Sequence, residues 1–443
     1  FYPYDPDNIS KAEIMVPFAE KTFITAYQST GIVMEGIDFE YVRAAAFNFT
    51  GMKDSKVDGC TFAHFTDANT FSGDNNIMQN CYLIDGAAGG VRINGGDTKT
   101  LTGGGNIVRN NVFKKLSTLR LSYSPSVNIQ GYGQIVENNE ISYSDHEMIA
   151  MSGMCHKVLK NEIHHAVQWT GDMGAMYWGR NPQNFGHEIA YNYFHHNGGL
   201  YAAGWSQSIF WDDGNTGPYL HDNVFYQGTM VAEHGGKYFA SKTYGGQYSL
   251  VENNIFVDNP YAQQFQGYGD YDGKTGQYIS SFLCYYGINY SGNKFVDYWD
   301  DNLLNGGYYT DTYKERFKGT QWQPWTELLS KDFFESTLKV YYDKYHDKDH
   351  PSKANAEDYA ALTNIAHQYA PRFQNQFNNN LVVKGLGALY NGSITTESNT
   401  YFSRSPEKDL FVDYDNENFK LTDDGLAKVR QTIPDFRNID MSD

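Results

Sequence analysis

The chain has 443 residues, a length that fits two or three ordinary domains or one long repeat protein. Its 34 Lys and Arg against 52 Asp and Glu give a net charge of −18, a field that repels a nucleic-acid backbone and excludes nucleic acid as a partner. Aromatic residues make up 16% and charged residues only 19%, with 43 Gly and 36 Tyr, which favours strands and turns over helices.

The beginning of the chain predicts an incomplete or processed N-terminus. Phe1 opens within patterned sequence and without Met, so we expect that an upstream N-terminal region is missing. No apolar stretch reaches the ~20 residues that a membrane span requires. Four N-glycosylation triplets, which would fit a secreted protein, begin at Asn8, Asn48, Asn289 and Asn391.

A short phrase recurs along the chain: an apolar pair, two polar residues, Asn, one residue, then Ile or Phe. Its marked Asn stands at positions 111, 139, 161, 192, 223 and 254, so the steps are 28, 22, 31, 31 and 31 residues. Steps of this size are single rungs of a β-helix. An Asn at the same turn of every rung stacks its amide on the next, ~4.8 Å away. The sequence therefore predicts an all-β fold, a right-handed parallel β-helix, with rungs over residues 1–300.

The cysteines add little chemistry to this pattern. Cys60 and Cys81 fall in the column of the repeated Asn, 21 residues apart. Side chains at neighbouring rung positions point in parallel, so we expect stacked buried thiols rather than a disulfide. The four cysteines show neither a CxxC pair nor the spacing of a zinc site.

Two segments that combine glycines, aromatic residues and aspartates flank the Asn192 phrase, and we expect them on consecutive rungs: residues 171–180 and 208–215. Cleavage of a glycosidic bond needs one protonated and one ionised carboxyl group. Asp172 and Asp213 are therefore the candidate catalytic pair. The alternative is that Gly-Asp and Asp-Asp-Gly form turns in which the carboxylates only accept backbone N–H bonds.

The register of these two segments sets a condition on that pair. Aligning residues 175–178 with 208–211 puts Asp213 in the column of Arg180, eight positions past Asp172. Acid and base carboxyl groups lie ~5 to 10 Å apart, so the chain must turn sharply near Gly171 or Gly174. Candidate supporting residues are Asp212, Glu233, His146 and Arg180, and candidate sugar-binding residues are Tyr177, Trp178, Trp211 and His234.

Histidines occur in or beside the repeated phrase, at His164, His195 and His196. We interpret them as hydrogen-bonded turn residues, because neither an HExxH motif nor an Asp-rich loop accompanies them. The chain also has no GxSxG elbow and no Gly-rich phosphate loop. The sequence therefore predicts neither a metal nor a cofactor.

The repeat fades after about Phe295. Residues 301–375 read as helical, acidic and aromatic, because apolar pairs recur there at roughly helical spacing. We predict that this segment leaves the solenoid as a helical and loop insertion that walls a cleft. Rungs return near Asn379, and residues 376–443 are expected to form the final rungs and a C-terminal tail.

A set of short motifs follows in a fixed order along the chain: Gly95-Gly-Asp, Tyr123-Ser-Pro-Ser-Val, Asp145-His, Asn161-Glu-Ile-His, Gly171-Asp-Met-Gly-Ala-Met-Tyr, Arg180, Tyr191-Asn-Tyr-Phe-His, Trp211-Asp-Asp, Leu421-Thr-Asp-Asp-Gly-Leu and Ile433-Pro-Asp-Phe. In this order the motifs resemble glycoside hydrolase family 141, a family of bacterial right-handed β-helix proteins with α-L-fucosidase and xylanase activities. The resemblance covers nearly the whole chain and implies a secreted or periplasmic enzyme whose catalytic candidates are Asp172, Asp212 and Asp213. Trp178 and Trp211 stand where the family has smaller or aliphatic residues, which predicts a narrowed sugar subsite.

Three functions remain open from the sequence. The leading hypothesis is hydrolysis of a polysaccharide or oligosaccharide by Asp172 and Asp213, with Asp212 or Glu233 adjusting their pKa. The second is a polysaccharide lyase, in which a basic residue removes the C5 proton of an acidic sugar; sparse basic residues near the two Asp segments count against it. The third is a non-catalytic β-helix with a structural or adhesive role.

Overall fold

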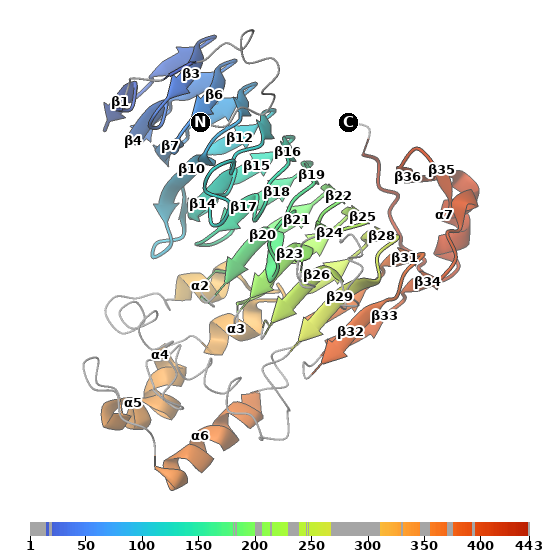
Figure 1. Ribbon diagram of the computed structural model, residues 1–443. Helices are drawn as coiled ribbons and strands as arrows, with labels where there is room; N and C mark the ends of the chain where they lie inside the picture. The colour runs from blue at the N-terminus through green and yellow to red at the C-terminus, as the bar shows by residue number, and fades with distance from the viewer. Residues whose placement is uncertain are drawn as a thin grey trace.

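The chain winds into a parallel β-helix in which each rung contributes one strand to each of three long sheets (Figure 1). The computed structural model describes residues 15–16, 20–179, 181, 184–199, 206–212, 215–228, 239–244, 246, 248–266, 311–328, 331–345, 355–369, 375–391 and 395–441. The predicted fold class is confirmed.

Counted over the described residues, as for the two sheets below, sheet A has 12 strands, one of which, β11 (Thr102–Gly103), pairs antiparallel with β10. The others run parallel in the order β1 (Ile24–Tyr27), β4 (Phe47–Lys53), β7 (Asp67–Asp74), β10 (Ala88–Asp97), β14 (Val127–Gly131), β17 (Ile149–Met151), β20 (Met173–Gly179), β23 (Ser206–Asp212), β26 (Phe239–Tyr244), β29 (Tyr261–Gln266) and β32 (Ala388–Asn391).

Sheets B and C each have 11 short strands. Sheet B contains β2 (Val33–Glu35), β5 (Lys56–Asp58), β8 (Ile77–Gln79), β12 (Ile107–Arg109), β15 (Ile135–Glu137), β18 (Lys157–Leu159), β21 (Glu188–Ala190), β24 (Tyr219–His221), β27 (Leu250–Glu252), β30 (Asn375–Asn378) and β33 (Thr395–Ser398). Sheet C contains β3 (Asp38–Val42), β6 (Thr61–Phe65), β9 (Tyr82–Ile84), β13 (Val112–Lys114), β16 (Glu140–Ser142), β19 (Glu162–His164), β22 (Tyr193–His195), β25 (Val224–Tyr226), β28 (Ile255–Val257), β31 (Leu381–Val383) and β34 (Tyr401–Ser403).

The repeated asparagines form a continuous ladder at the turn between sheets B and C, as the sequence predicts. Asn192 Nδ2 donates to Asn223 Oδ1 at 3.0 Å, and Asn223 Nδ2 donates to Asn254 Oδ1 at 3.0 Å. Each amide also meets backbone groups; Asn192 Nδ2, for example, donates to the Val158 carbonyl at 2.8 Å. The residue before each ladder Asn is in the left-handed region, which makes the bend: Asn110, Asn138, Lys160, Tyr191, Asp222, Asn253 and Asn379.

The cysteines of the early rungs extend the same column. The Cys81 backbone N–H donates to Asn111 Oδ1 at 2.9 Å, so Cys81 occupies the ladder position of its own rung. Cys60 and Cys81 are buried free thiols, and burial raises the pKa of Cys81 to about 12. The expected stacked thiols are confirmed. Such thiols pack the interior and are not reactive at neutral pH.

Helices replace the rungs between β29 and β30 (Figure 1). They lie within the predicted insertion, residues 301–375, parts of which are outside the described residues. The segments around the first two helices pack on turns that follow sheet A, where Trp322 Nε1 donates to the Gly217 carbonyl at 2.9 Å. The Phe317 ring lies 4.8 Å from that of Phe185. The helices are α2 (Asp311–Arg316), α3 (Gln323–Leu328), α4 (Lys331–Phe333), a π-helix (Phe334–Leu338), α5 (Lys339–Tyr345) and α6 (Ala356–Tyr369).

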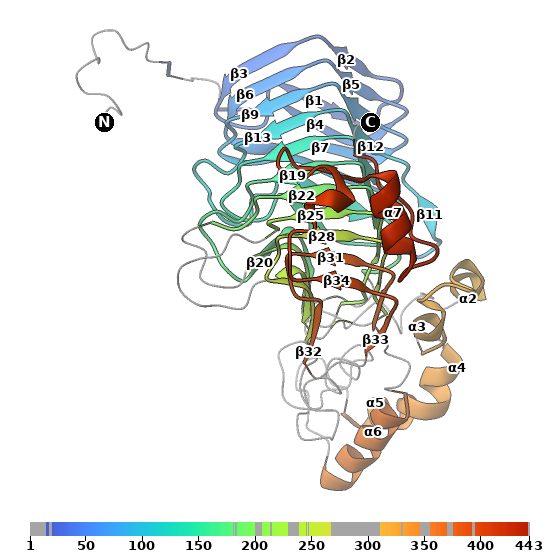
Figure 2. The ribbon, with the colours of Figure 1, turned by 90° about the vertical axis from the view of Figure 1, so that its right-hand side faces the viewer.

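A C-terminal unit covers part of the outer face of sheet C (Figure 2). It consists of a 3-10 turn (Lys408–Leu410), the hairpin β35 (Phe411–Asp413) and β36 (Asn418–Leu421), and α7 (Asp423–Arg430). Its apolar side chains form one cluster with Val224, Ile255 and Leu381 of sheet C. In the part of the chain that the structure describes, no helix is both long and apolar enough to cross a membrane.

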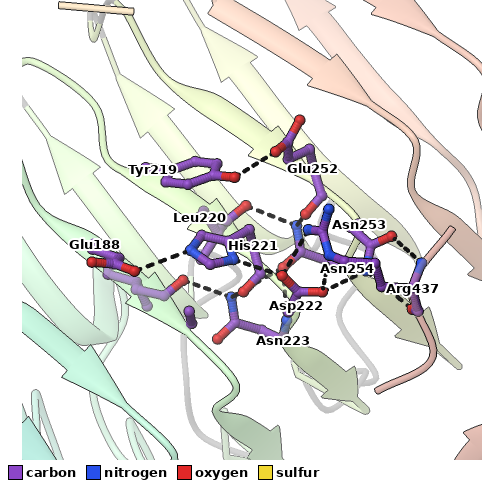
Figure 3. Close-up of polar contacts among 12 residues, drawn as sticks. Glu188, Tyr219, Leu220, His221, Asp222, Asn223, Glu252, Asn253, Asn254 and Arg437 are labelled. Carbon is purple, nitrogen blue, oxygen red and sulfur yellow. Dashed lines mark hydrogen bonds and ion pairs between the residues drawn. The ribbon is translucent and has the colours of Figure 1, made fainter. Parts of the chain in front are cut away.

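An ion pair between a half-exposed arginine and a buried aspartate at the end of a sheet B strand holds the C-terminal tail (Figure 3). Arg437 Nη2 donates to Asp222 Oδ2 at 2.7 Å and its Nε donates to Oδ1 at 3.1 Å. Asn253 Nδ2 also donates to Asp222 Oδ1, at 2.6 Å, and His221 Nδ1 lies 2.7 Å from Oδ2. The carboxylate of Asp222 is therefore fully hydrogen-bonded although the residue is only 2% exposed.

Candidate functional site on sheet A

Residues of three consecutive rungs form an outward-facing column on sheet A. The register pairs Tyr177 of β20 with Phe210 of β23, and Phe210 with Lys242 of β26. This register confirms the alignment of the two segments expected from the sequence. Gln264 of β29 continues the column after Lys242. Aromatic, cationic and amide side chains therefore follow one another at the strand spacing of a sheet.

A hydrogen bond joins this column to a carboxylate at its side. The Tyr177 hydroxyl donates to Asp212 Oδ2 at 3.0 Å. The register places Gly179 directly beside Asp212. A Cβ on Gly179 would lie only 2.7 Å from the Tyr177 hydroxyl oxygen, so the missing side chain leaves room for this bond.

Lys242 is the feature that sequence reasoning missed. It is only 2% exposed, and its Nζ lies 4.8 Å from the centre of the Phe210 ring. Burial lowers the pKa of Lys242 to about 8, while the negative charges of Asp172 and Asp212 act in the opposite direction. An amine of lowered pKa therefore lies near two of the aspartates that the sequence predicted as site residues.

Asp172 and His146 occupy the turns that lead into sheet A. Asp172 stands directly before β20 with φ of 58°, a left-handed turn conformation. Thr170 lies in the same turn as Asp172. Its hydroxyl donates to the carbonyl of Asp145, in the turn of the rung before, at 2.8 Å, and this bond connects the two turns. His146 is buried beneath the Tyr123 ring and contacts the Glu147 carboxylate. Burial lowers the pKa of His146 to about 4, so the ring is neutral at pH 7.

Trp178 and Trp211 do not form a sugar platform, contrary to the prediction. The register pairs them, and their rings stack with centroids 5.8 Å apart inside the solenoid. Trp178 is 1% exposed and Trp211 is fully buried, and both belong to the main hydrophobic core. Strand alternation turns them inward with Met176 and Ile209, so an indole here fills core volume and cannot narrow a surface subsite.

Four predicted site residues lie outside the described residues: Asp213, Arg180, Glu233 and His234. The expected separation of Asp172 and Asp213 is therefore a prediction that the structure does not address. The described part of the predicted site consists of Asp172, Asp212 and Tyr177, together with the more deeply placed His146. Of these, Tyr177 and Asp212 are in direct contact.

Two groups of side chains on sheet C have the geometry of metal ligands. Glu162, His164 and His195 form the first, and His195, His196 and Glu417 form the second. In each group one ligand atom per residue lies within 4.8 Å of the others. These histidines stand at the positions that the sequence analysis interpreted as turn residues.

The sheet A site can perform proton transfer. Carboxylates, a phenol and an ammonium of lowered pKa share one surface, and a general acid or base works best when its pKa is near the operating pH.

Searches against family models, curated proteins and solved structures gave no match to the chain.

Proposed function

We propose that the chain is a glycoside hydrolase that acts on a complex polysaccharide, with its site on the outer face of sheet A. The observation that carries the proposal is the hydrogen bond of Tyr177 to Asp212 in the column that continues to Lys242, with Asp172 and Asp212 close enough to raise the pKa of Lys242 against the effect of burial. Hydrolysis needs an acid and an ionised carboxylate on one surface. We assign these roles to Asp172 and Asp213, with Asp212 and Lys242 as their charged neighbours.

The resemblance to glycoside hydrolase family 141 supports this proposal, because both the Gly-Asp and the Asp-Asp motifs are present. A solenoid also repeats the same strand positions from rung to rung, which suits a polymer of repeating sugar units. Fucosidase-like or xylanase-like activity and a secreted or periplasmic location belong to the same proposal.

The experiment is product analysis with the full chain on fucosylated, xylan and algal polysaccharides. Replacing Asp172 or Asp213 by Asn should lower activity by about 10²- to 10⁴-fold, the usual contribution of general acid–base catalysis. The matched control is Asp67→Asn, which changes an exposed aspartate of sheet A in β7. Full activity in either catalytic variant, or no product from any polysaccharide, would contradict the proposal.

Lys242 favours one second candidate, a polysaccharide lyase. The sequence argument against a lyase was the lack of basic residues near the Asp segments, and Lys242 removes it. In a lyase this amine would take the C5 proton of an acidic sugar while the C4–O bond breaks and a double bond forms. Isotopically labelled water separates the two: hydrolysis incorporates its oxygen into the product, whereas elimination does not.

A further inference from the structure

The outer face of sheet C carries four histidines on two neighbouring rungs. The register pairs His164 of β19 with His195 of β22, and their rings stack 4.7 Å apart at 11°. The next residues, His165 and His196, stack in the same way at 5.5 Å and 20°. We call these four residues the histidine cluster. Its spacing follows from the distance between strands, ~4.8 Å.

Within each rung the two imidazoles meet edge to edge. His165 and His196 have φ of 56° and 51°, a left-handed turn that swings each ring toward the histidine before it. His164 Nδ1 lies 2.7 Å from His165 Nδ1, and His195 Nδ1 lies 2.8 Å from His196 Nδ1. Each contact joins one N–H to one lone pair, so the two rings of a rung share a single proton between these nitrogens.

Carboxylates face the remaining nitrogens. Glu162 Oε1 lies 3.0 Å from His195 Nε2, and Glu417 Oε1 lies 3.6 Å from His196 Nε2. Glu162 and its neighbour Tyr193 also line a pocket of about 670 Å³. The side chains of His164 and His195 are 12% and 10% exposed, and that of Glu162 is 51% exposed. An ion can therefore reach the Glu162 carboxylate, which borders the two histidines, from the pocket.

We propose that Glu162, His164 and His195 bind a divalent transition-metal ion such as Zn²⁺, and that His165 and His196 are positioning residues. One ligand atom from each of the three lies within 4.8 Å of the others. Ligand atoms of a tetrahedral zinc ion are about 3.3 Å apart. Side-chain rotations that move the three ligand atoms by roughly 1 Å therefore complete the site. Two imidazoles and one carboxylate, with the fourth position open, form a common zinc set.

The hydrogen bonds of the histidine cluster suit this role. A metal-bound imidazole usually donates its other N–H to a partner that fixes its tautomer. When Nε2 of His195 binds the ion, its Nδ1–H donates to His196, whose Nε2–H is directed at Glu417.

The test is titration of the metal-free full chain with Co²⁺, followed by visible absorption and competition with Zn²⁺. The variants are His195→Gln, His196→Gln and Glu162→Gln, the last because a half-exposed side chain can be changed without disturbing the fold. The control is His64→Gln, an exposed histidine near the end of β6 on the same sheet, which stacks on Tyr41 at 4.8 Å. Circular dichroism checks that each variant is folded.

We expect one equivalent of Co²⁺ to give the visible band of a four-coordinate ion, which Zn²⁺ displaces. His196→Gln should weaken binding by about 10- to 100-fold, as loss of an outer partner does, and His195→Gln should weaken it further. His64→Gln should bind as the unaltered chain does. The proposal is overturned if the chain shows no such band, or if folded His195→Gln and Glu162→Gln both bind with unchanged affinity.

Discussion

The Tyr177 hydroxyl reaches Asp212 across a position that has no side chain. A Cβ at Gly179 would press on the end of the phenol, 2.7 Å from its oxygen, but would lie 3.5 Å from Asp212 Cβ. The end of a tyrosine can move at little cost to folding, so a methyl group here changes the position of the hydroxyl more than the stability of the rung. Gly179 therefore tests the hydrogen bond without removing either partner.

We expect Gly179→Ala to lower kcat/KM by about 10- to 100-fold, because a hydrogen bond to a charged group contributes roughly 1.5–3 kcal/mol. Tyr177→Phe should have a similar effect, since it deletes the same bond. The double variant should be no worse than either single variant. Additive losses in the double variant, measured by steady-state kinetics, would show that the two residues act separately.

The inward position of Trp178 and Trp211 was available from the sequence. Met176 and Trp178 have the same parity along their strand, as do Ile209 and Trp211, and two aliphatic residues of one parity indicate the core face. Tyr177 and Phe210 then face outward. The prediction that these tryptophans bind sugar left out this alternation, and their burial in the core corrects it.

Lys242 could not be placed from the sequence in the same way. The repeated phrase fixes the turn between sheets B and C, but the number of residues between sheet A and that turn differs from rung to rung. A shift of one position exchanges inward and outward side chains, so the Asn ladder alone does not determine which residue of β26 follows Phe210. The histidine contacts depend likewise on ring orientations that spacing does not specify.

At the scale of elements, the C-terminal tail is held by groups whose pKa values are shifted from their usual values in opposite directions. The hydrogen bond with His221 lowers the pKa of Glu188 to about 2. Burial opposes ionisation of Asp222, but hydrogen bonds from His221 and Arg437 outweigh it and lower the pKa of Asp222. Burial also opposes protonation of His221, yet its hydrogen bonds to Asp222 and Glu188 raise the pKa of His221.

These shifts define the pH range in which the tail is held most firmly. The carboxylates stabilise the folded state fully above their unfolded pKa values, about 4, and this stabilisation is lost as the pH falls through the lowered folded values. His221 contributes fully below its unfolded value, about 6.5, and its contribution is lost as the pH rises through the raised folded value. Attachment should therefore be strongest between about pH 4 and 6.5.

Asp222→Asn should release the tail, because Arg437 loses a bidentate ionic partner. Hydrogen exchange of the Arg437 backbone N–H, which donates to Asn253 Oδ1 at 2.9 Å, should become faster, and its protection factor should lose most of its dependence on pH. The control is Asp415→Asn, which removes an exposed ion pair with Lys408 in the same C-terminal unit. Unchanged exchange in Asp222→Asn would contradict this role.

At the scale of the whole molecule, the C-terminal unit acts as a cover for an apolar part of sheet C. Val224, Ile255 and Leu381 are buried in one cluster with Phe419 and Val429 of that unit. Repeat proteins need such covers, because exposed apolar surface promotes association. We expect a chain that ends at residue 405 to form dimers or larger species, measured by light scattering after size exclusion.

A rescue variant separates exposure of this surface from misfolding. Replacing Val224, Ile255 and Leu381 by Thr in the shortened chain places a β-branched residue with a hydroxyl group at each of these strand positions. The rescued chain should be monomeric. If the shortened chain is already monomeric without these substitutions, the covering role is wrong.

The asparagine ladder passes directly from Asn254 to Asn380, across the helical insertion. The two residues are 126 positions apart, whereas Asn223 and Asn254 are 31 apart. Because loop-closure entropy grows only with the logarithm of length, this larger loop costs about 1.2 kcal/mol more to close than an ordinary rung. This cost is small, but the insertion also delays completion of the solenoid. During synthesis the earlier rungs can stack as they emerge, whereas the last rungs can stack only after the whole insertion has been translated. The unpaired edge of β27 and β28 is thus the surface that a nascent chain must protect longest.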